Sequence, residues 1–467
     1  MLQYSVRLQA LLQTYVRMTR LDGYDQASRG REFNRLIAEA LQCWGIDAKH
    51  NIPGSGEIDV GFELEGRHFV LEAKWDAPPT NDGPISKLKF RLRQRLPGTV
   101  GIFLSMNGFT KDALKTIKEG EQPAVICLSR EHLEAFLSGF IPPAEFFKAL
   151  VRAASQPGEF VPSLQSLYPT PSLRASEVIY GPPVEVSPLV VEAVLDLKAQ
   201  VLLSHLSDIQ GVASLGKNSL LLTLSSGMWE ADLKNRELRP FLALPNCTGS
   251  PLVMEDGSIL VARAAGIARV EKNELTFIAG GLPVPVRLFR APHQRTALGF
   301  SGGLKIPGFD VNPHVLHLGN SLGEQQREEL DIPEGWCSNA AQLPDESYLV
   351  FGSRGVWRVP RGGRSELILD HQWSSPMGLV AEPSSDAFIV ASNYGVLLSR
   401  HRAKNCVALW RVDVERRNVA RLATLNLGAS APGLASLEED AHLLFSYYAA
   451  SDGNKGILVR VQCPKAA

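Results

Sequence analysis

Two acidic side chains and one lysine lie close together in the stretch GSGEIDVGFELEGRHFVLEAKW, residues 54–75. Asp59 falls in the first of two apolar runs, and Glu72 and Lys74 fall in the second. Because side chains alternate along a strand, Glu72 and Lys74 are expected on one face, with Ala73 turned into the core. Two carboxylates suit a hard divalent cation such as Mg²⁺ or Mn²⁺. Such a cation can activate water against a phosphodiester, while a lysine offsets the developing negative charge.

An exposed strand edge also carries acids and bases as solvated surface residues or as a surface ion pair. The run from Phe69 to Leu71 is apolar, however, and indicates a buried strand. Such a strand should not carry an acid without cause, so the functional interpretation is favoured.

Basic residues gather after this hairpin, beyond a loop at residues 76–84. The segment KLKFRLRQRL contains five of them: Lys87, Lys89, Arg91, Arg93 and Arg95. This density predicts contacts with DNA phosphates even though the whole chain is nearly neutral. Leu88, Leu92 and Leu96 recur at helical spacing, so an ordinary solvated amphipathic helix is the alternative.

The elements that must position these residues alternate between helix and strand up to about residue 150. An apolar stripe from Phe33 to Trp44, with spacings of three and four, predicts a helix that ends at Gly45. Short apolar runs predict strands at 58–63, 68–73, 100–105 and 124–128, and further helices are expected at 109–118 and 130–138. This order predicts an α/β fold with a mixed central sheet flanked by helices.

A proline-rich segment, residues 154–188, follows and is interpreted as a linker. Beyond it short strands recur, and the stretches SPLVMEDGSILVARAAGIARVEKNEL and NAAQLPDESYLVFGSRGVWRVPRGGR share one pattern. Asp256 and Asp345 lie 89 residues apart, and so do Gly266 and Gly355. This spacing is twice a period of about 44 or 45, which predicts β-propeller blades with a degenerate unit in between. We expect about six blades, with a β-sandwich or parallel β-helix as the alternative.

Composition excludes several classes of protein. The 467 residues include 48 basic and 49 acidic side chains, so the chain has no overall cationic field. An apolar run of roughly 18 residues, as a transmembrane helix needs, is absent, and the N-terminal stretch does not resemble a secretory signal. Six cysteines without CxxC spacing indicate thiols in a reducing cytoplasm. No motif supports a serine hydrolase, an NTPase or an oxidoreductase.

Several of these features together resemble the PD-(D/E)xK nuclease superfamily, and within it the Mrr-like restriction endonuclease domain. They are Gly30-Arg-Glu-Phe33 at the first helix, Asp59, Glu72-Ala73-Lys74 and the passage VGIFLSMNGFTKDAL. The resemblance covers about residues 30–113 and implies a restriction-endonuclease-like fold. It also implies that Asp59, Glu72 and the Ala73 carbonyl bind the metal ion and that Lys74 is the catalytic lysine.

One position departs from the family pattern. Such nucleases commonly place a glutamate directly after the aromatic residue of the first helix, where this chain has Asn34. Glu32 and Glu39 lie seven residues apart on one helix face, and either could supply the missing acid. Glu32 is therefore included among the predicted catalytic residues.

The resulting prediction is a Mg²⁺- or Mn²⁺-dependent endonuclease that hydrolyses DNA phosphodiester bonds. A nuclease domain is expected at 1–153, a linker at 154–188 and a β-propeller-like domain at 189–467. By analogy, the chain is expected to be a cytoplasmic prokaryotic defence effector whose propeller senses a trigger or docks a protein partner, without a membrane. The resemblance also implies a homo-oligomer, because nucleases of this fold often act as dimers.

Two other functions stay open from the residues. The nuclease fold could be catalytically degenerate and bind nucleic acid, with the propeller as a protein-interaction scaffold. A propeller hydrolase or lactonase with its own metal centre is the third alternative, although the repeated acids Asp256 and Asp345 fall in turns rather than at inner-strand positions.

Overall fold

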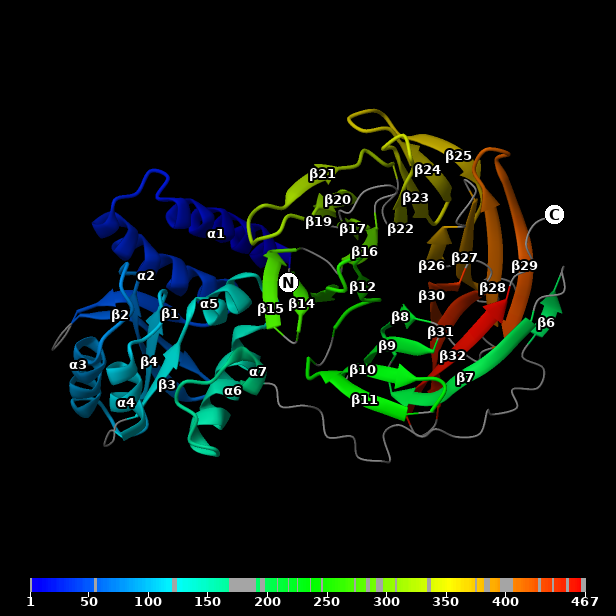
Figure 1. Ribbon diagram of the computed structural model, residues 1–467. Helices are drawn as coiled ribbons and strands as arrows, with labels where there is room; N and C mark the ends of the chain where they lie inside the picture. Colours follow the sequence, from blue (N-terminus) through cyan, green and yellow to red (C-terminus); the bar gives the residue numbers. More distant parts are fainter. Residues whose placement is uncertain are drawn as a thin grey trace.

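Helices around one β-sheet occupy the N-terminal third of the chain, and further β-sheets arranged around a ring follow (Figure 1). The computed structural model describes residues 2–53, 57–119, 124–167, 190–193, 198–207, 209–216, 218–224, 226–235, 237–244, 247–272, 274–282, 286–290, 297–306, 309–333, 337–373, 376–381, 387–394, 406–426, 430–438, 441–450 and 453–462. None of the helices within these ranges is long and apolar enough to cross a membrane.

A five-stranded mixed sheet forms the centre of the N-terminal region. Its strands are β1 (Ala48–Ile52), β2 (Ile58–Leu64), β3 (Arg67–Lys74), β4 (Val100–Ser105) and β5 (Val125–Leu128), paired in that order. The pairs β1–β2 and β2–β3 are antiparallel, whereas β3–β4 and β4–β5 are parallel. The mixed α/β character predicted for this region is confirmed.

Seven helices are described in this region: α1 (Leu2–Arg20), α2 (Gln26–Cys43), α3 (Asp82–Arg93), α4 (Lys111–Glu119), α5 (Arg130–Leu137), α6 (Pro143–Ser155) and α7 (Leu164–Leu167). The alternation of β3 separates two cores. Leu71 belongs to a core shared with α2 and α6, whereas Val70 packs with α3 and α4 on the other side. The sheet is therefore covered by helices on both faces.

The predicted linker begins as ordered structure. α6 extends to Ser155, and the following turn is attached to the sheet because Cys127 N donates to Phe160 O at 2.8 Å. Residues 168–189 of this segment lie outside the described ranges. The domain boundaries at 153 and 188 stay predictions.

The remaining described strands group into six sheets of four or five strands and one strand pair. In sheet order the first three are β11 (Glu237–Leu242), β10 (Gly227–Asp232), β9 (Ser219–Leu224), β8 (Gly211–Gly216); β12 (Leu252–Val253), β13 (Ile259–Arg263), β14 (Gly266–Glu271), β15 (Glu274–Ala279); and β16 (Arg287–Arg290), β17 (Ala297–Ser301), β20 (His314–His317), β21 (Gln326–Glu329). The strand pair β18 (Leu304–Ile306) and β19 (Phe309–Val311) lies between β17 and β20 in sequence.

The other three sheets are β22 (Cys337–Gln342), β23 (Tyr348–Gly352), β24 (Gly355–Val359), β25 (Glu366–Asp370); β26 (Pro376–Ala381), β27 (Ala387–Tyr394), β28 (Cys406–Asp413), β29 (Asn418–Asn426), β6 (Val190–Ala193); and β30 (Ser430–Glu438), β31 (Ala441–Ala450), β32 (Gly453–Gln462), β7 (Lys198–Ser207). β6 and β7 thus come from the start of this region and pair with strands from its end. The arrangement is a β-propeller, as predicted.

The repeated sequence pattern corresponds to one sheet of this propeller. Asp256 and Asp345 each accept hydrogen bonds in a turn from the serine two residues later, through both its N–H and its hydroxyl. Gly266 and Gly355 begin the equivalent strands β14 and β24. The degenerate unit expected between the two copies is the sheet built from β16, β17, β20 and β21.

The N-terminal region packs directly on the propeller (Figure 1). One hydrophobic core includes residues of α1 and α5 together with strands β13 to β15, and the rings of Phe140 and Phe277 lie 5.5 Å apart across the boundary. Gly281 N donates to Ser138 O at 3.0 Å. A Cβ atom at the preceding Gly280 would lie 2.5 Å from the Ser138 backbone, so only glycine allows this close approach.

Candidate functional site

The predicted acids lie where the strand pair β2–β3 opens. The pairing of these strands ends at Val60 and Leu71, whereas β3 stays paired with β4 as far as Lys74 and Ser105. Ala73 N has no main-chain partner on β2 and donates instead to the side chain of the β2 residue Asp59, at 2.8 Å from Oδ2. Because the N–H and C=O of one strand residue point to the same side, the Ala73 carbonyl oxygen faces this opening too.

Asn34 holds the other oxygen of Asp59. Its Nδ2 atom lies 3.1 Å from Asp59 Oδ1 and 3.1 Å from Asn51 Oδ1. The residue at the position of the family's missing glutamate is therefore a hydrogen-bond donor that orients Asp59. It does not add a negative charge.

Glu72 lies beside this opening and forms an ion pair with Arg91 of α3. Both side chains are largely buried, with 16% of Glu72 and 10% of Arg91 exposed. Burial raises the pKa of Glu72 to about 7, and the negative charge of Asp59 adds to the shift, while Arg91 opposes it. Burial also raises the pKa of Asp59, against the hydrogen bonds from Ala73 and Asn34. The two carboxylates thus interact electrostatically in a poorly solvated place.

Lys74 lies at the edge of this opening, and Glu32 lies on the surface of α2. Lys74 Nζ lies 3.8 Å from Asp76 Oδ2, and 43% of its side chain is exposed, so it lies at the mouth of the site. Glu32 pairs with Arg35 on its own helix, so its carboxylate is already engaged on the surface of α2. The same holds for Glu39, which lies 3.7 Å from Arg7 and 3.8 Å from Arg35.

The oxygen atoms that face this opening determine which ion it can bind. Each oxygen of Asp59 accepts one hydrogen bond and keeps a second lone pair free, and the Ala73 carbonyl faces the same space. Within the described ranges, no group of three or more His, Cys, Asp or Glu residues is placed to hold a metal ion. Two carboxylates and a carbonyl nevertheless match the way Mg²⁺ binds, because this ion keeps several of its waters.

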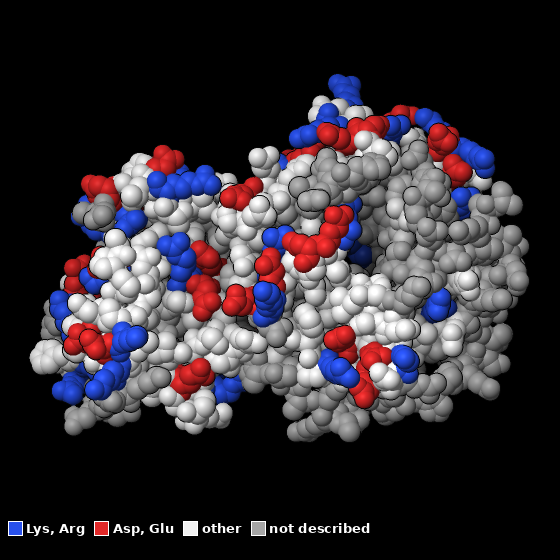
Figure 2. Space-filling model, in the orientation of Figure 1, with Lys and Arg blue, Asp and Glu red and all other residues white. Residues whose placement is uncertain are grey.

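Only part of the predicted basic patch is exposed to solvent. Lys89 is buried and its Nζ atom donates to Thr116 O at 3.1 Å, and Arg91 is buried against Glu72. Lys87 and Arg93 are exposed, and Arg95 is partly exposed. Two of the five cations are therefore structural. On the face shown in Figure 2, basic and acidic side chains alternate over the surface.

The sequence prediction named Arg91 but missed its role as the partner of Glu72. Its position on α3 carried a signal, since Arg91 lies three and six residues beyond the apolar positions Leu88 and Ile85 and shares their buried face. A basic residue on a buried face needs an acidic partner, and Glu72 is an acid at the end of the strand predicted to be buried.

Neither a known protein family nor a curated protein matches the chain. Several solved structures resemble it. A gluconolactonase from Xanthomonas campestris is 14% identical, covers 62% of this chain and 97% of its own, and has a TM-score of 0.43. Virginiamycin B lyase from Staphylococcus aureus is 12% identical, covers 58% and 99%, and has a TM-score of 0.38. An oligogalacturonate lyase in complex with manganese is 10% identical, covers 59% and 95%, and has a TM-score of 0.37.

These similar structures are β-propellers and none is a nuclease, so the predicted membership of the PD-(D/E)xK superfamily is wrong. The predicted function and enzyme class, a Mg²⁺-dependent deoxyribonuclease, are wrong with it. The alternative of a degenerate nuclease fold that binds nucleic acid as a scaffold is not supported either. The resemblance depended on few positions, and two of them, Glu32 and Lys74, form ion pairs with Arg35 and Asp76.

Proposed function

We propose that the chain binds one divalent cation, Mg²⁺ or Mn²⁺, in the opening between β2 and β3. Asp59 and Glu72 are the carboxylate ligands in this proposal, and the Ala73 carbonyl oxygen is the third ligand. The observation that carries it is the Asp59–Ala73 hydrogen bond, because it fixes a carboxylate and a carbonyl on the same side of an unpaired strand segment.

Electrostatics supports the same site. Two partly buried carboxylates repel each other, although Arg91 and the more distant charges of Lys74 and Lys87 oppose this effect. A divalent cation bound directly by both carboxylates would remove their mutual repulsion. Arg91 is then a built-in competitor, which must move away from Glu72 when that carboxylate becomes a ligand.

The residues around the ligands would position them. Asn34 fixes one oxygen of Asp59, and hydrogen bonds of this kind orient ligands and raise metal affinity. Lys74 and Asp76 form the exposed mouth through which a hydrated ion would enter. When bound, the cation would supply a positive centre able to polarise an oxygen of a small ligand.

The direct test is a titration of the metal-free chain with Mn²⁺, followed by the loss of the free-ion electron paramagnetic resonance signal. We expect one ion per chain in the wild type. Asp59→Asn should weaken binding by about tenfold or more, since a neutral amide is a poorer ligand than a carboxylate. Glu63→Gln is the matched control, because Glu63 is an exposed acid on the same hairpin away from the opening.

The variant Arg91→Gln provides a second test of the site. Removing the competing guanidinium should raise Mn²⁺ affinity, whereas a variant that only disturbed the fold would lower it. Equal affinities for wild type, Asp59→Asn and Glu63→Gln would show that the bound ion occupies another place and would refute the proposal.

A further inference from the structure

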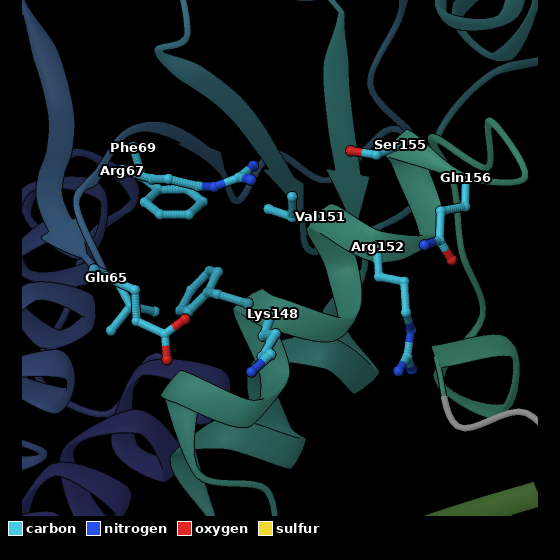
Figure 3. A pocket seen from close by; sticks show the side chains of 10 residues that line it. Glu65, Arg67, Phe69, Lys148, Val151, Arg152, Ser155 and Gln156 are labelled. Carbon is cyan, nitrogen blue, oxygen red and sulfur yellow. The ribbon is translucent and has the colours of Figure 1, made fainter.

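A pocket lies on the N-terminal region at the end of β3 away from the acid pair. It has a volume of about 300 Å³ and lies between the turn joining β2 to β3 and the outer face of α6 (Figure 3). This volume is at the lower end of the ~300–1,000 Å³ range of small-molecule pockets. About five residues, roughly 17 Å along an extended strand, separate Arg67 at this pocket from Glu72 at the strand opening.

The floor of the pocket is apolar. Leu64, Phe69, Phe147 and Val151 line it, and the rings of Phe69 and Phe147 lie 5.6 Å apart at an interplanar angle of 50°. Phe69 also stacks on Phe62, with 4.8 Å between the ring centroids, so the floor is held by a packed aromatic cluster. A rigid apolar floor favours a ligand with an aromatic or branched apolar body.

The rim of the pocket carries an excess of positive charge. Arg67 comes from β3, and Lys148 and Arg152 come from α6, with Glu65 as the acidic residue of the lining. Figure 3 shows Arg67 reaching over the pocket toward Val151, with Lys148 and Arg152 along the α6 side. The rim therefore surrounds the apolar floor with cations from two different elements.

The cations of this rim are poorly compensated within the described part of the chain. Lys148 and Arg152 are four residues apart on one helix, an arrangement in which like charges repel. Arg152 donates to Leu167 O at 3.0 Å, which uses only part of its guanidinium. Among the described residues, neither Arg67 nor Lys148 has a side-chain ion pair. An anionic group next to Lys148 and Arg67 would compensate their charges and reduce the repulsion between Lys148 and Arg152.

We infer that this pocket binds a small amphiphilic organic anion, with its apolar body on the Phe69–Phe147 floor and its acidic group between Arg67 and Lys148. A phosphate monoester and a carboxylate share this chemistry. Arg67 can hold either one through two parallel N–H donors, and Lys148 contributes a point charge.

Isothermal titration calorimetry with 1-naphthyl phosphate tests the inference, with 1-naphthoate, 1-naphthol and inorganic phosphate as companion ligands. One of the two aromatic anions should bind with one site per chain. Neutral 1-naphthol and inorganic phosphate should each bind about tenfold or more weakly, since each lacks one half of the recognised chemistry. The tighter of the two aromatic anions identifies the acidic group that the pocket prefers.

Two variants with different defects locate the site. The double variant Arg67→Gln/Lys148→Gln should bind the aromatic anion about tenfold or more weakly than the wild type does. Its affinity for 1-naphthol should be unchanged. Val151→Asp should lower the affinity for the aromatic anion and for 1-naphthol, because it places a charge in the apolar floor. Lys111→Gln, at an exposed lysine on α4, is the control that should bind as the wild type does.

Unchanged binding of the aromatic anion by the double variant would overturn the inference, and so would the absence of binding by folded wild-type protein at millimolar ligand. Thermal unfolding of each variant shows that it is folded. Because these residues lie apart from Asp59 and Glu72, the result is independent of cation binding.

Discussion

Arg263 of the propeller strand β13 holds Glu145 of helix α6 with Nη2 at 2.6 Å from one carboxylate oxygen and 2.7 Å from the other. The Arg263 side chain is only 2% exposed, and its Nη1 donates to Phe140 O at 2.6 Å. One arginine therefore joins the propeller to the N-terminal region through a side chain and a main-chain carbonyl. Such a buried guanidinium depends on its partners, because little water reaches it.

Removing the acidic partner should destabilise the chain strongly. Glu145→Ala leaves Arg263 buried and without its carboxylate, which we expect to cost about 3 kcal/mol of unfolding free energy. Glu131→Ala, at an exposed acid on the nearby helix α5, should change stability by less than about 0.5 kcal/mol. Urea denaturation of both variants gives the comparison. A loss below about 1 kcal/mol for Glu145→Ala would mean that the pair is not needed at this boundary.

Gly280 provides a second test of the boundary. Gly280→Ala forces a Cβ atom against the backbone of Ser138, and we expect a cost of about 1–3 kcal/mol. Gly30→Ala is its control, since a Cβ at Gly30 in α2 meets no atom within 4 Å and alanine favours a helix. The two thermal unfolding temperatures should move in opposite directions.

Glu72 should make stability fall as the pH rises in the absence of divalent ions. Its pKa is raised by burial from 4.5 to about 7, so the protonated acid is the form that the fold favours. The favourable contribution is complete below pH 4.5 and is lost as the pH rises through about 7. Between about pH 4.5 and 8 in EDTA, the unfolding free energy of the wild type should fall by on the order of 2–3 kcal/mol relative to that of Glu72→Gln. Parallel stability curves for the two proteins would contradict the assigned environment of Glu72.

His132 should make the stability of the chain fall as the pH is lowered, the opposite of the effect of Glu72. Burial lowers its pKa from 6.5 to about 4, so the neutral ring is the form that the fold favours. Its contribution is complete above pH 6.5 and is lost as the pH falls toward 4. His132 Nδ1 accepts from Ser129 N at 3.1 Å, and glutamine can replace it in this capping position. Acid unfolding of His132→Gln should begin at lower pH than that of the wild type, and an identical midpoint would contradict the prediction.

Local pattern was enough to predict much of the fold. The strand predicted at 100–105 coincides with β4, because a parallel central strand is apolar on both faces. The 89-residue spacing of Asp256 and Asp345 predicted the propeller, since both acids make the same short-range bonds to the serine two residues later. Interactions of this kind depend on a few neighbouring residues and are visible in sequence.

The site was harder to predict because its partners are distant in sequence. The spacing of Asp59 and Glu72 gave their common place at the end of a strand pair, but Arg91 reaches Glu72 only because α3 packs on that face of the sheet. The helix α6 was assigned no role, although it carries Glu145 at the propeller boundary and Lys148 at the pocket. Both roles depend on which elements meet in space, and no local periodicity encodes that.

The pairing of β7 with β32 has a consequence for how this chain is synthesised. β7 (residues 198–207) is synthesised about 250 residues before its partner strand β32 (residues 453–462). β7 therefore cannot pair with β32 until the end of the chain has been made. At roughly 5–20 residues per second this interval lasts on the order of 10–50 s. Throughout that time the edge of β7 exposes unpaired N–H and C=O groups, which attract other strands. Newly made chains should therefore depend on chaperones until the last strand emerges.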